Sequence, residues 1–339
     1  MFDNFKAPED CVCTSATTTG TIIFQIIVLI GLIIMIWLLR KKNPHIIREF
    51  FLMATGILIF EMFTAPMWKN GHLGPWAYIY KDVSWVLCAL WSIQFWGFNK
   101  LADHYFKKWK EFKRFGLTVF LITISSIILE NVIINLGIRE YSPEVNERLS
   151  GIKLILAPIE MLYYVPVFSG LILGFYKLWN FHLNDVPIVP SLKKVTVTNF
   201  VVALISSALF EIMVEPMSIN TGFPQWGYFY YDVNIVLTLL WVLIIWITTT
   251  LVDRTLIHLN IVNSFVLYLF VGTLIYLPIE AALMGAGYSN YSATTSSEFS
   301  GIIIPGLGIP FEVCFAIPLY LALIIGLIRY CRIVIENKF

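Results

Sequence analysis

Long apolar runs occupy most of this chain, and nine of them are long enough to cross a bilayer. Hydrophobic residues make up 58% of the sequence and charged residues only 13%, whereas a soluble domain carries roughly 25% charge. The runs are continuous and do not alternate with polar residues, so they favour α-helices over a β-barrel. The sequence therefore predicts an all-α integral membrane protein with about nine transmembrane helices.

The connecting segments predict how these helices are oriented. We expect spans at about 21–40, 48–67, 83–99, 115–137, 152–176, 196–215, 232–252, 261–284 and 302–328. Of the 23 Lys and Arg residues, 17 fall in alternate connections on one side. Because cytoplasmic loops are enriched in Lys and Arg, the N-terminus should lie outside the cell membrane and the C-terminus in the cytoplasm.

The sequence also repeats itself at an offset of 150 residues, and the repeat preserves acidic residues. The matched acids are Glu61 and Glu211, Asp82 and Asp232, Glu130 and Glu280, and, with a two-residue insertion, Glu160 and Glu312. One acid has no counterpart, because Ala65 stands where the second half has Glu215. Each half holds four spans, an even number, so both should enter the membrane in the same direction and be related by an axis along the membrane normal.

This repeat divides the chain into five parts. We expect an outer N-terminal segment with one extra helix (1–45), a first four-helix repeat (46–180), a cytoplasmic linker (181–195), a second four-helix repeat (196–330) and a cytoplasmic tail (331–339).

The acids within the spans are the first candidates for a functional site, because a carboxylate in hydrocarbon is costly. The spans place Glu61, Glu130 and Glu160 roughly 10–12 Å below the outer surface. The second half repeats them as Glu211, Glu280 and Glu312. No Lys or His lies at that depth, and burial without a cation raises the pKa of an acid. We therefore expect some of the six to be protonated and to act as catalytic acids or bases.

An aromatic segment accompanies the acids in each half. Its members are Trp76, Tyr78 and Asp82 in the first half and Trp226, Tyr228 and Asp232 in the second. These aromatic residues could form an interfacial belt, or they could bind substrate as a wall whose π-faces stabilise a carbocation.

Other chemistries have little support in the sequence. The net charge of +1 offers no general attraction for nucleic acid. The five histidines fall in loops or at span ends, which argues against bis-His haem and against Glu-x-x-His di-iron sites. No Gly-x-Gly-x-x-Gly or Walker motif indicates a nucleotide or flavin. We therefore expect no cofactor and no metal, and we expect Cys11 and Cys13 to be unpaired or locally oxidised thiols.

Two copies of a short motif suggest a family. Pro158-x-Glu160 lies in GIKLILAPIEMLYYVPVF and Pro310-x-Glu312 in GLGIPFEVCFAIPLY, each downstream of a Trp-x-Tyr segment. Over residues 46–330 this tandem pattern resembles the repeated domain of the membrane-intrinsic, flavin-free lycopene (carotenoid) cyclases and, more loosely, the membrane terpene cyclases. The resemblance implies that acids within the spans protonate an alkene and quench the resulting cation.

Three functions remain open on the sequence alone. The first is cofactor-independent cyclisation or hydration of a polyene or isoprenoid lipid by paired carboxylates between the halves. The second is a proton- or cation-coupled transporter, which would use the same acids as a binding site. The third is a non-catalytic membrane subunit or lipid-binding protein on a cyclase-like scaffold. We expect the partner to be a membrane lipid or an isoprenoid substrate, and we expect no nucleic acid.

Overall fold

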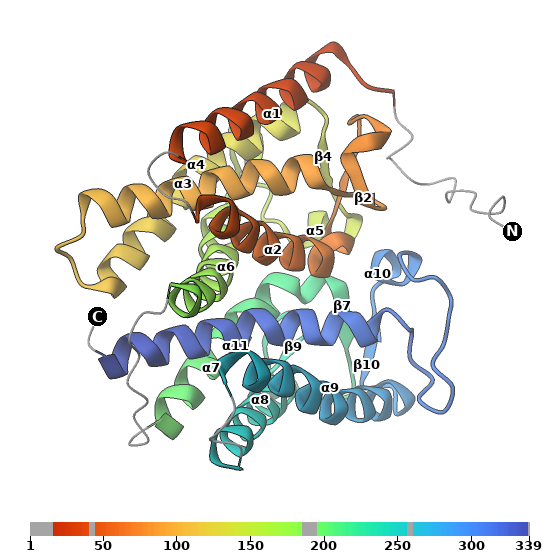
Figure 1. Ribbon diagram of the computed structural model, residues 1–339. Coiled ribbons are helices and arrows are strands. Elements are labelled where there is room, and N and C mark those ends of the chain that lie inside the picture. The colour runs from red at the N-terminus through yellow and green to blue at the C-terminus, as the bar shows by residue number, and fades with distance from the viewer. Residues whose placement is uncertain (1–15, 41–44, 185–194, 256–259, 338–339) are drawn as a thin grey trace, which may run out of the picture.

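The computed structural model describes residues 16–40, 45–184, 195–255 and 260–337 (Figure 1). Within these ranges eight helices are long and apolar enough to cross a membrane, which confirms an all-α membrane protein. They are α1 (Thr19–Arg40), α2 (Ile46–Thr64), α4 (Glu111–Asn135), α6 (Met161–Leu183), α7 (Val195–Val214), α8 (Ile235–Thr255), α9 (Ile261–Gly285) and α11 (Val313–Asn337).

A further helix, α3 (Trp85–Tyr105), occupies the place of the expected third span but is too polar to be counted with the eight. Its polar side chains point into the protein. Gln94 donates to the hydroxyl of Ser126 at 3.0 Å, and the Lys100 ammonium lies 2.5 Å from the Glu49 carboxylate. The helix thus buries polar groups that pair with α4 and α2.

The order of elements recurs in the two halves of the chain. After α2 come η2 (Ala65–Met67), β1 (Trp68–Asn70), η3 (Pro75–Ala77), β2 (Tyr78–Tyr80), β3 (Val83–Ser84), α3, α4, β4 (Arg139–Tyr141), α5 (Pro143–Arg148), β5 (Lys153–Leu154), β6 (Ala157–Pro158) and α6. After α7 come η4 (Glu215–Met217), β7 (Ser218–Asn220), η5 (Gln225–Gly227), β8 (Tyr228–Tyr230), β9 (Val233–Asn234), α8, α9, β10 (Ser289–Tyr291), α10 (Ala293–Ser297) and α11.

The short strands of both halves gather at one end of the molecule, which we call the strand end (Figure 1). There β1 pairs with β4, with Asn70 opposite Arg139, and β7 pairs with β10, with Asn220 opposite Ser289. Alternate residues of a strand face the same side. Arg139 and Tyr141 therefore face one way, and Ser289 and Tyr291 do the same in the second half.

The fifth and ninth predicted spans began too early. Residues 152–160 form a hairpin of β5 and β6, and Ile303 bridges Pro310 in the corresponding loop. Residues with positive φ turn the chain here, Gly151 and Ile155 in the first half and three glycines between 301 and 308 in the second. The helices begin only at Met161 and Val313, so Glu160 and Glu312 precede them and do not lie within spans.

The predicted cytoplasmic tail differs from expectation. Residues 331–337 continue α11, so most of the predicted tail is helical, because its apolar residues Ile333 and Val334 pack into the core. Most of the expected linker (185–194) lies outside the described residues, as do Cys11 and Cys13.

The halves meet through contacts between matching positions. Gly174 of α6 faces Leu327 of α11, and Gly326 of α11 faces Phe175 of α6. In the middle of the molecule, the rings of Phe60 and Phe210 lie 6.2 Å apart.

A third such contact lies at the strand end. The backbone N–H of Thr294, at the start of α10, donates at 2.8 Å to the carboxylate of Glu144, its counterpart in α5. Contacts between equivalent positions arise on a two-fold-like axis, and these three are spread along the length of the helices.

Candidate functional site

In the first half, one arginine pairs with two of the predicted acids. The guanidinium of Arg139 lies 3.5 Å from a carboxylate oxygen of Glu61 and 3.5 Å from one of Glu130. All three side chains are buried. Arg139 also lies over the Trp68 ring, 4.8 Å from its centroid. The expectation that the acids have no cationic partner was therefore wrong for this half, because β4 brings the arginine inward from the strand end.

Two further hydrogen bonds complete this first-half cluster. Tyr141 donates to Glu130 at 2.8 Å, and the Trp68 indole donates to Glu61 at 3.3 Å. The side chains leave a cavity of only about 40 Å³. Glu61 and Glu130 are thus satisfied by the protein itself.

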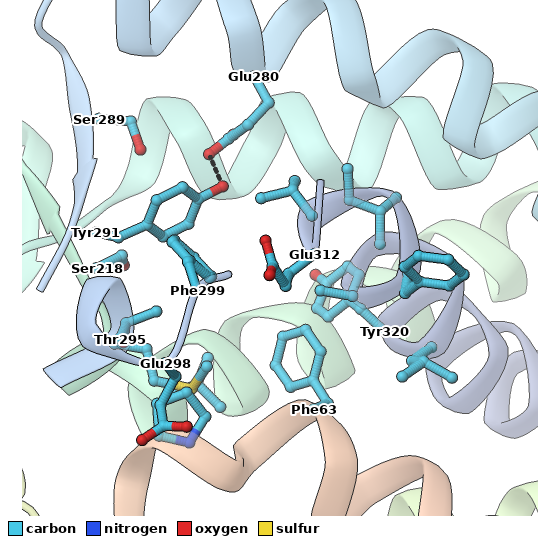
Figure 2. A pocket seen from close by; sticks show the side chains of 18 of the residues that line it. Phe63, Ser218, Glu280, Ser289, Tyr291, Thr295, Glu298, Phe299, Glu312 and Tyr320 are labelled. Carbon is cyan, nitrogen blue, oxygen red and sulfur yellow. Dashed lines mark hydrogen bonds between the residues drawn. The ribbon is translucent and has the colours of Figure 1, made fainter. Parts of the chain in front are cut away.

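The second half keeps the acids and loses the side chains that fill this space. Three replacements at matching positions account for the difference. Arg139 becomes Ser289, Trp68 becomes Ser218, and Tyr164 becomes Ala316. All three small residues line the resulting cavity of about 590 Å³, and Figure 2 shows Ser218 and Ser289 beside it. A volume of this size is typical of small-molecule sites.

Three of the predicted acids line this cavity. Thr238 donates a hydrogen bond to one oxygen of Glu211, and the other oxygen is buried with no partner. Tyr291 donates to Glu280 at 3.2 Å (Figure 2). Glu312 points into the middle of the cavity (Figure 2). Among the described residues, no Lys or Arg forms a salt bridge with any of these three acids.

Glu312 is held by the loop that precedes α11. The backbone N–H of Ser300 donates to one carboxylate oxygen at 2.5 Å, and the other oxygen has no hydrogen-bond partner. Partial burial raises the pKa of Glu312, but the hydrogen bonds from Ser300 outweigh it and hold the pKa below its usual value. This carboxylate is therefore ionised at neutral pH. Glu160 has the same arrangement with Ser150 at 2.7 Å, but it lines neither cavity.

Two more acids line the cavity, and each forms a salt bridge with a cation from the first half of the chain. Lys81 lies 3.0 Å from Glu298, and Arg148 lies 3.1 Å from Glu215. Glu215, which has Ala65 at the matching position of the first half, also has one buried oxygen that lacks a partner. Among the described residues, no three His, Cys, Asp or Glu side chains lie close enough together to hold a metal ion.

The six residues predicted from the aromatic segment lie outside the cavities, although the backbone N–H of Asp232 donates to Glu215 at 3.3 Å. Trp76 and Trp226 are exposed, and the Tyr78 and Tyr228 hydroxyls accept hydrogen bonds from the backbone of their own loops at 3.3 Å. Neither these four residues nor Asp82 and Asp232 line either cavity. Of this segment only the neighbouring Tyr80 of β2 lines the larger cavity, and most of the aromatic residues around it come from other elements, among them Phe63, Trp241, Tyr276 and Tyr320.

Asp82 provides a test of the local electrostatics. Burial, and secondarily the nearby Glu298, raise the pKa of Asp82 from 3.8 to about 6, against the opposing effect of Lys69 and Lys81. The folded state therefore binds more protons than the unfolded state between about pH 4 and 6, so this group costs stability as pH rises through that window. We expect Asp82→Asn to raise the melting temperature at pH 7 by about 2–4 °C and to have no effect below about pH 4.

Thermal unfolding of the detergent-solubilised protein between pH 4 and 8 measures this difference. The matched control is Asp232→Asn, which removes a carboxylate 3.2 Å from Arg148 and should lower the melting temperature at pH 7. Equal shifts for both variants would contradict the assignment.

Comparisons with protein-family models, curated proteins and solved structures found no match to this chain. The functional reading therefore depends on the site itself. Reasoning from the sequence found the acids but missed Arg139 and Ser289, which decide what the acids can do. The 150-residue offset could have revealed them, because it aligns Arg139 with Ser289, nine residues after the preserved pair Glu130 and Glu280.

Proposed function

We propose that the protein catalyses the acid-dependent cyclisation or hydration of a polyene or isoprenoid lipid in the cavity of the second half. The observation that supports this most is the difference between the halves. Glu61 and Glu130 share the Arg139 guanidinium in a closed cluster, whereas Glu211 and Glu280 line a mainly apolar cavity of about 590 Å³ and have no salt bridge among the described residues. Carboxyls in such surroundings suit proton transfer to a hydrophobic substrate.

In this proposal Glu211 carries the proton. It adds the proton to a terminal double bond, and the electron pair of that bond forms the new C–H bond. The tertiary cation is then attacked by a neighbouring double bond, which closes a ring. Glu312, ionised at the far wall, removes a proton from the adjacent carbon and a new double bond forms. The product is an isomer of the substrate; capture of the cation by water would give an alcohol instead.

The cavity wall supports a cation of this kind. The rings of Trp241 and Tyr276 stack at 3.7 Å on one side, and Phe63 and Tyr320 lie on another. Aromatic π-faces attract positive charge. The repeated Pro-x-Glu motif, which resembles that of the membrane-intrinsic carotenoid cyclases, points to the same class of chemistry.

The membrane arrangement belongs to the same proposal. We place all nine long helices, α3 included, across the cell membrane, with the two four-helix repeats in parallel about an axis along the membrane normal. The three contacts between equivalent positions support this axis. Because the Lys and Arg bias favours a cytoplasmic C-terminus, the strand end faces outward and the cavity lies in the outer leaflet.

The two halves supply matched variants for a direct test. The protein and its Glu211→Gln and Glu61→Gln variants are expressed in hosts that make lycopene or other linear isoprenoids, and the extracted lipids are separated by mass and retention time. We expect wild type to form an isomer or a hydrate, Glu211→Gln to reduce its yield by about 100-fold or more, and Glu61→Gln to retain it.

Protein level and size-exclusion profile are measured for every variant, so that loss of product is not confused with loss of protein. An unchanged lipid profile with wild type across these substrates would refute the proposed reaction. Loss of product in Glu61→Gln but not in Glu211→Gln would move the reaction to the first half.

A further inference from the structure

The charges around the larger cavity are strongly one-sided. Five of its lining residues are glutamates, and none of the described residues that line it is Lys, Arg or His. Two of the five, Glu298 and Glu215, are paired with Lys81 and Arg148 from outside the cavity. The remaining three are Glu211, Glu280 and Glu312.

Unpartnered polar atoms aim into the same space. Glu215 is 2% exposed, and one of its carboxylate oxygens has no hydrogen-bond partner. One carboxylate oxygen of Glu211, one of Glu312 and the hydroxyl of Tyr320 are also buried without a hydrogen-bond partner. Buried polar atoms are costly unless they are satisfied, so this pattern indicates a ligand that carries a hydrogen-bond donor or a positive charge.

The first half shows what satisfies such acids. There Arg139 places a guanidinium 3.5 Å from both Glu61 and Glu130, above the ring of Trp68. The second half retains the counterparts of both glutamates but has Ser289 in place of the arginine. The second half therefore has both carboxylates but, among the described residues, no internal cation between them.

The apolar walls indicate what accompanies the charge. Ile302, Phe311 and Phe315 line the cavity and are 58%, 43% and 58% exposed. A chain that runs from the acids past these residues would leave the cavity between apolar side chains at the membrane-facing surface. The site therefore suits a cation attached to a hydrocarbon tail.

We propose that the cavity binds lipophilic amines, and that the ammonium group takes in the second half the place of the Arg139 guanidinium in the first. The aromatic walls add cation–π attraction to the carboxylates. The inference rests on the proposed function in one respect, since a bound ammonium is a stable counterpart of the carbocation proposed there. Binding itself requires no turnover and is measured separately.

A matched set of twelve-carbon ligands tests the proposal. Protein in nanodiscs of neutral lipid is dialysed against radiolabelled N,N-dimethyldodecylamine, which is positively charged at pH 7, or against 1-dodecanol, which is not, with empty nanodiscs as the blank. We expect the amine to bind at least about tenfold more tightly than the alcohol, a difference of about 1.4 kcal/mol.

Three variants locate the site. Glu312→Gln should weaken amine binding about tenfold and leave the alcohol unchanged. Ser289→Arg should abolish amine binding, because the new guanidinium occupies the position of the ammonium. Glu160→Gln, the counterpart of Glu312 that lines neither cavity, should bind the amine as wild type does. Equal binding of amine and alcohol, or equal effects of Glu312→Gln and Glu160→Gln, would overturn the proposal.

Ser289→Arg and Glu312→Gln are compared with wild type by melting temperature, so that a misfolded variant is recognised. The two proposals fail separately. Product formation without preference for the amine would remove this inference and leave the reaction in place. Selective amine binding without any product would leave a lipophilic-cation site and remove the reaction.

Discussion

Replacing Arg139 by Met is expected to destabilise the protein by about 3–5 kcal/mol, because it leaves two buried carboxylates without their shared cation. Met keeps much of the apolar stem and packs against Trp68, so the loss comes mainly from charge and not from volume. In a protein of this size such a loss lowers the melting temperature by roughly 10 °C. Thermal unfolding in detergent at pH 7 measures it.

The acids themselves provide the control. The triple change Arg139→Met, Glu61→Gln and Glu130→Gln removes the cation and both charges together, and it should recover most of the lost stability. The single change Ser289→Met, at the matching position of the second half, should have a small effect because no ion pair is broken. If Arg139→Met melts like wild type, the three charges do not form the buried cluster described above.

The difference between the two halves changes how the repeated acids are interpreted. A duplicated set of acids in a membrane protein first indicates a shared site between two equivalent halves. The side chains around them indicate otherwise, because Trp68, Arg139 and Tyr164 fill in the first half the space that Ser218, Ser289 and Ala316 leave open in the second. In the first half Glu61 and Glu130 belong to a packed cluster, whereas in the second half Glu211 has an unpartnered oxygen and lines the free volume that a ligand requires.

Much of the fold could be predicted from local sequence, because apolar runs in a bilayer have few alternatives to the helix. The boundaries at 152 and 302 could not, because apolar residues such as Ile152, Ile155 and Ile302 extend the apolar runs into hairpins. Hydrophobicity does not distinguish a helix from a short hairpin at the membrane surface. The glycines at 151 and 301, both with positive φ, are local signals of the turn, and in the second half Gly306 and Gly308 add to them.

The acids of the site could be predicted, but their partners could not. Glu61 and Arg139 are far apart in sequence, and only the pairing of β1 with β4 turns Arg139 inward. From the sequence, the same arginine looks like an interfacial residue of an outer loop. The cavity likewise depends on tertiary packing, because its walls combine α2, α7, α8, α9 and α11.

The contact between the halves should be sensitive to a single methyl group. A Cβ on Gly174 would lie 2.8 Å from the Leu327 Cα, so Gly174→Ala must push α6 and α11 apart. We expect a loss of about 2–3 kcal/mol, as for overpacked cores. This exceeds the gain of up to about 1 kcal/mol that Ala brings to a helix.

Gly170→Ala in the same helix is the matched control, because a Cβ there meets no atom within 4 Å. It should leave stability unchanged or raise it slightly, so the two variants, four residues apart in α6, should shift the melting temperature in opposite directions. Gly326→Ala, at the reciprocal contact, should also destabilise but less, because its Cβ would lie 3.0 Å from the Phe175 Cα. Equal melting temperatures for Gly174→Ala and Gly170→Ala would show that the halves do not meet closely at this point.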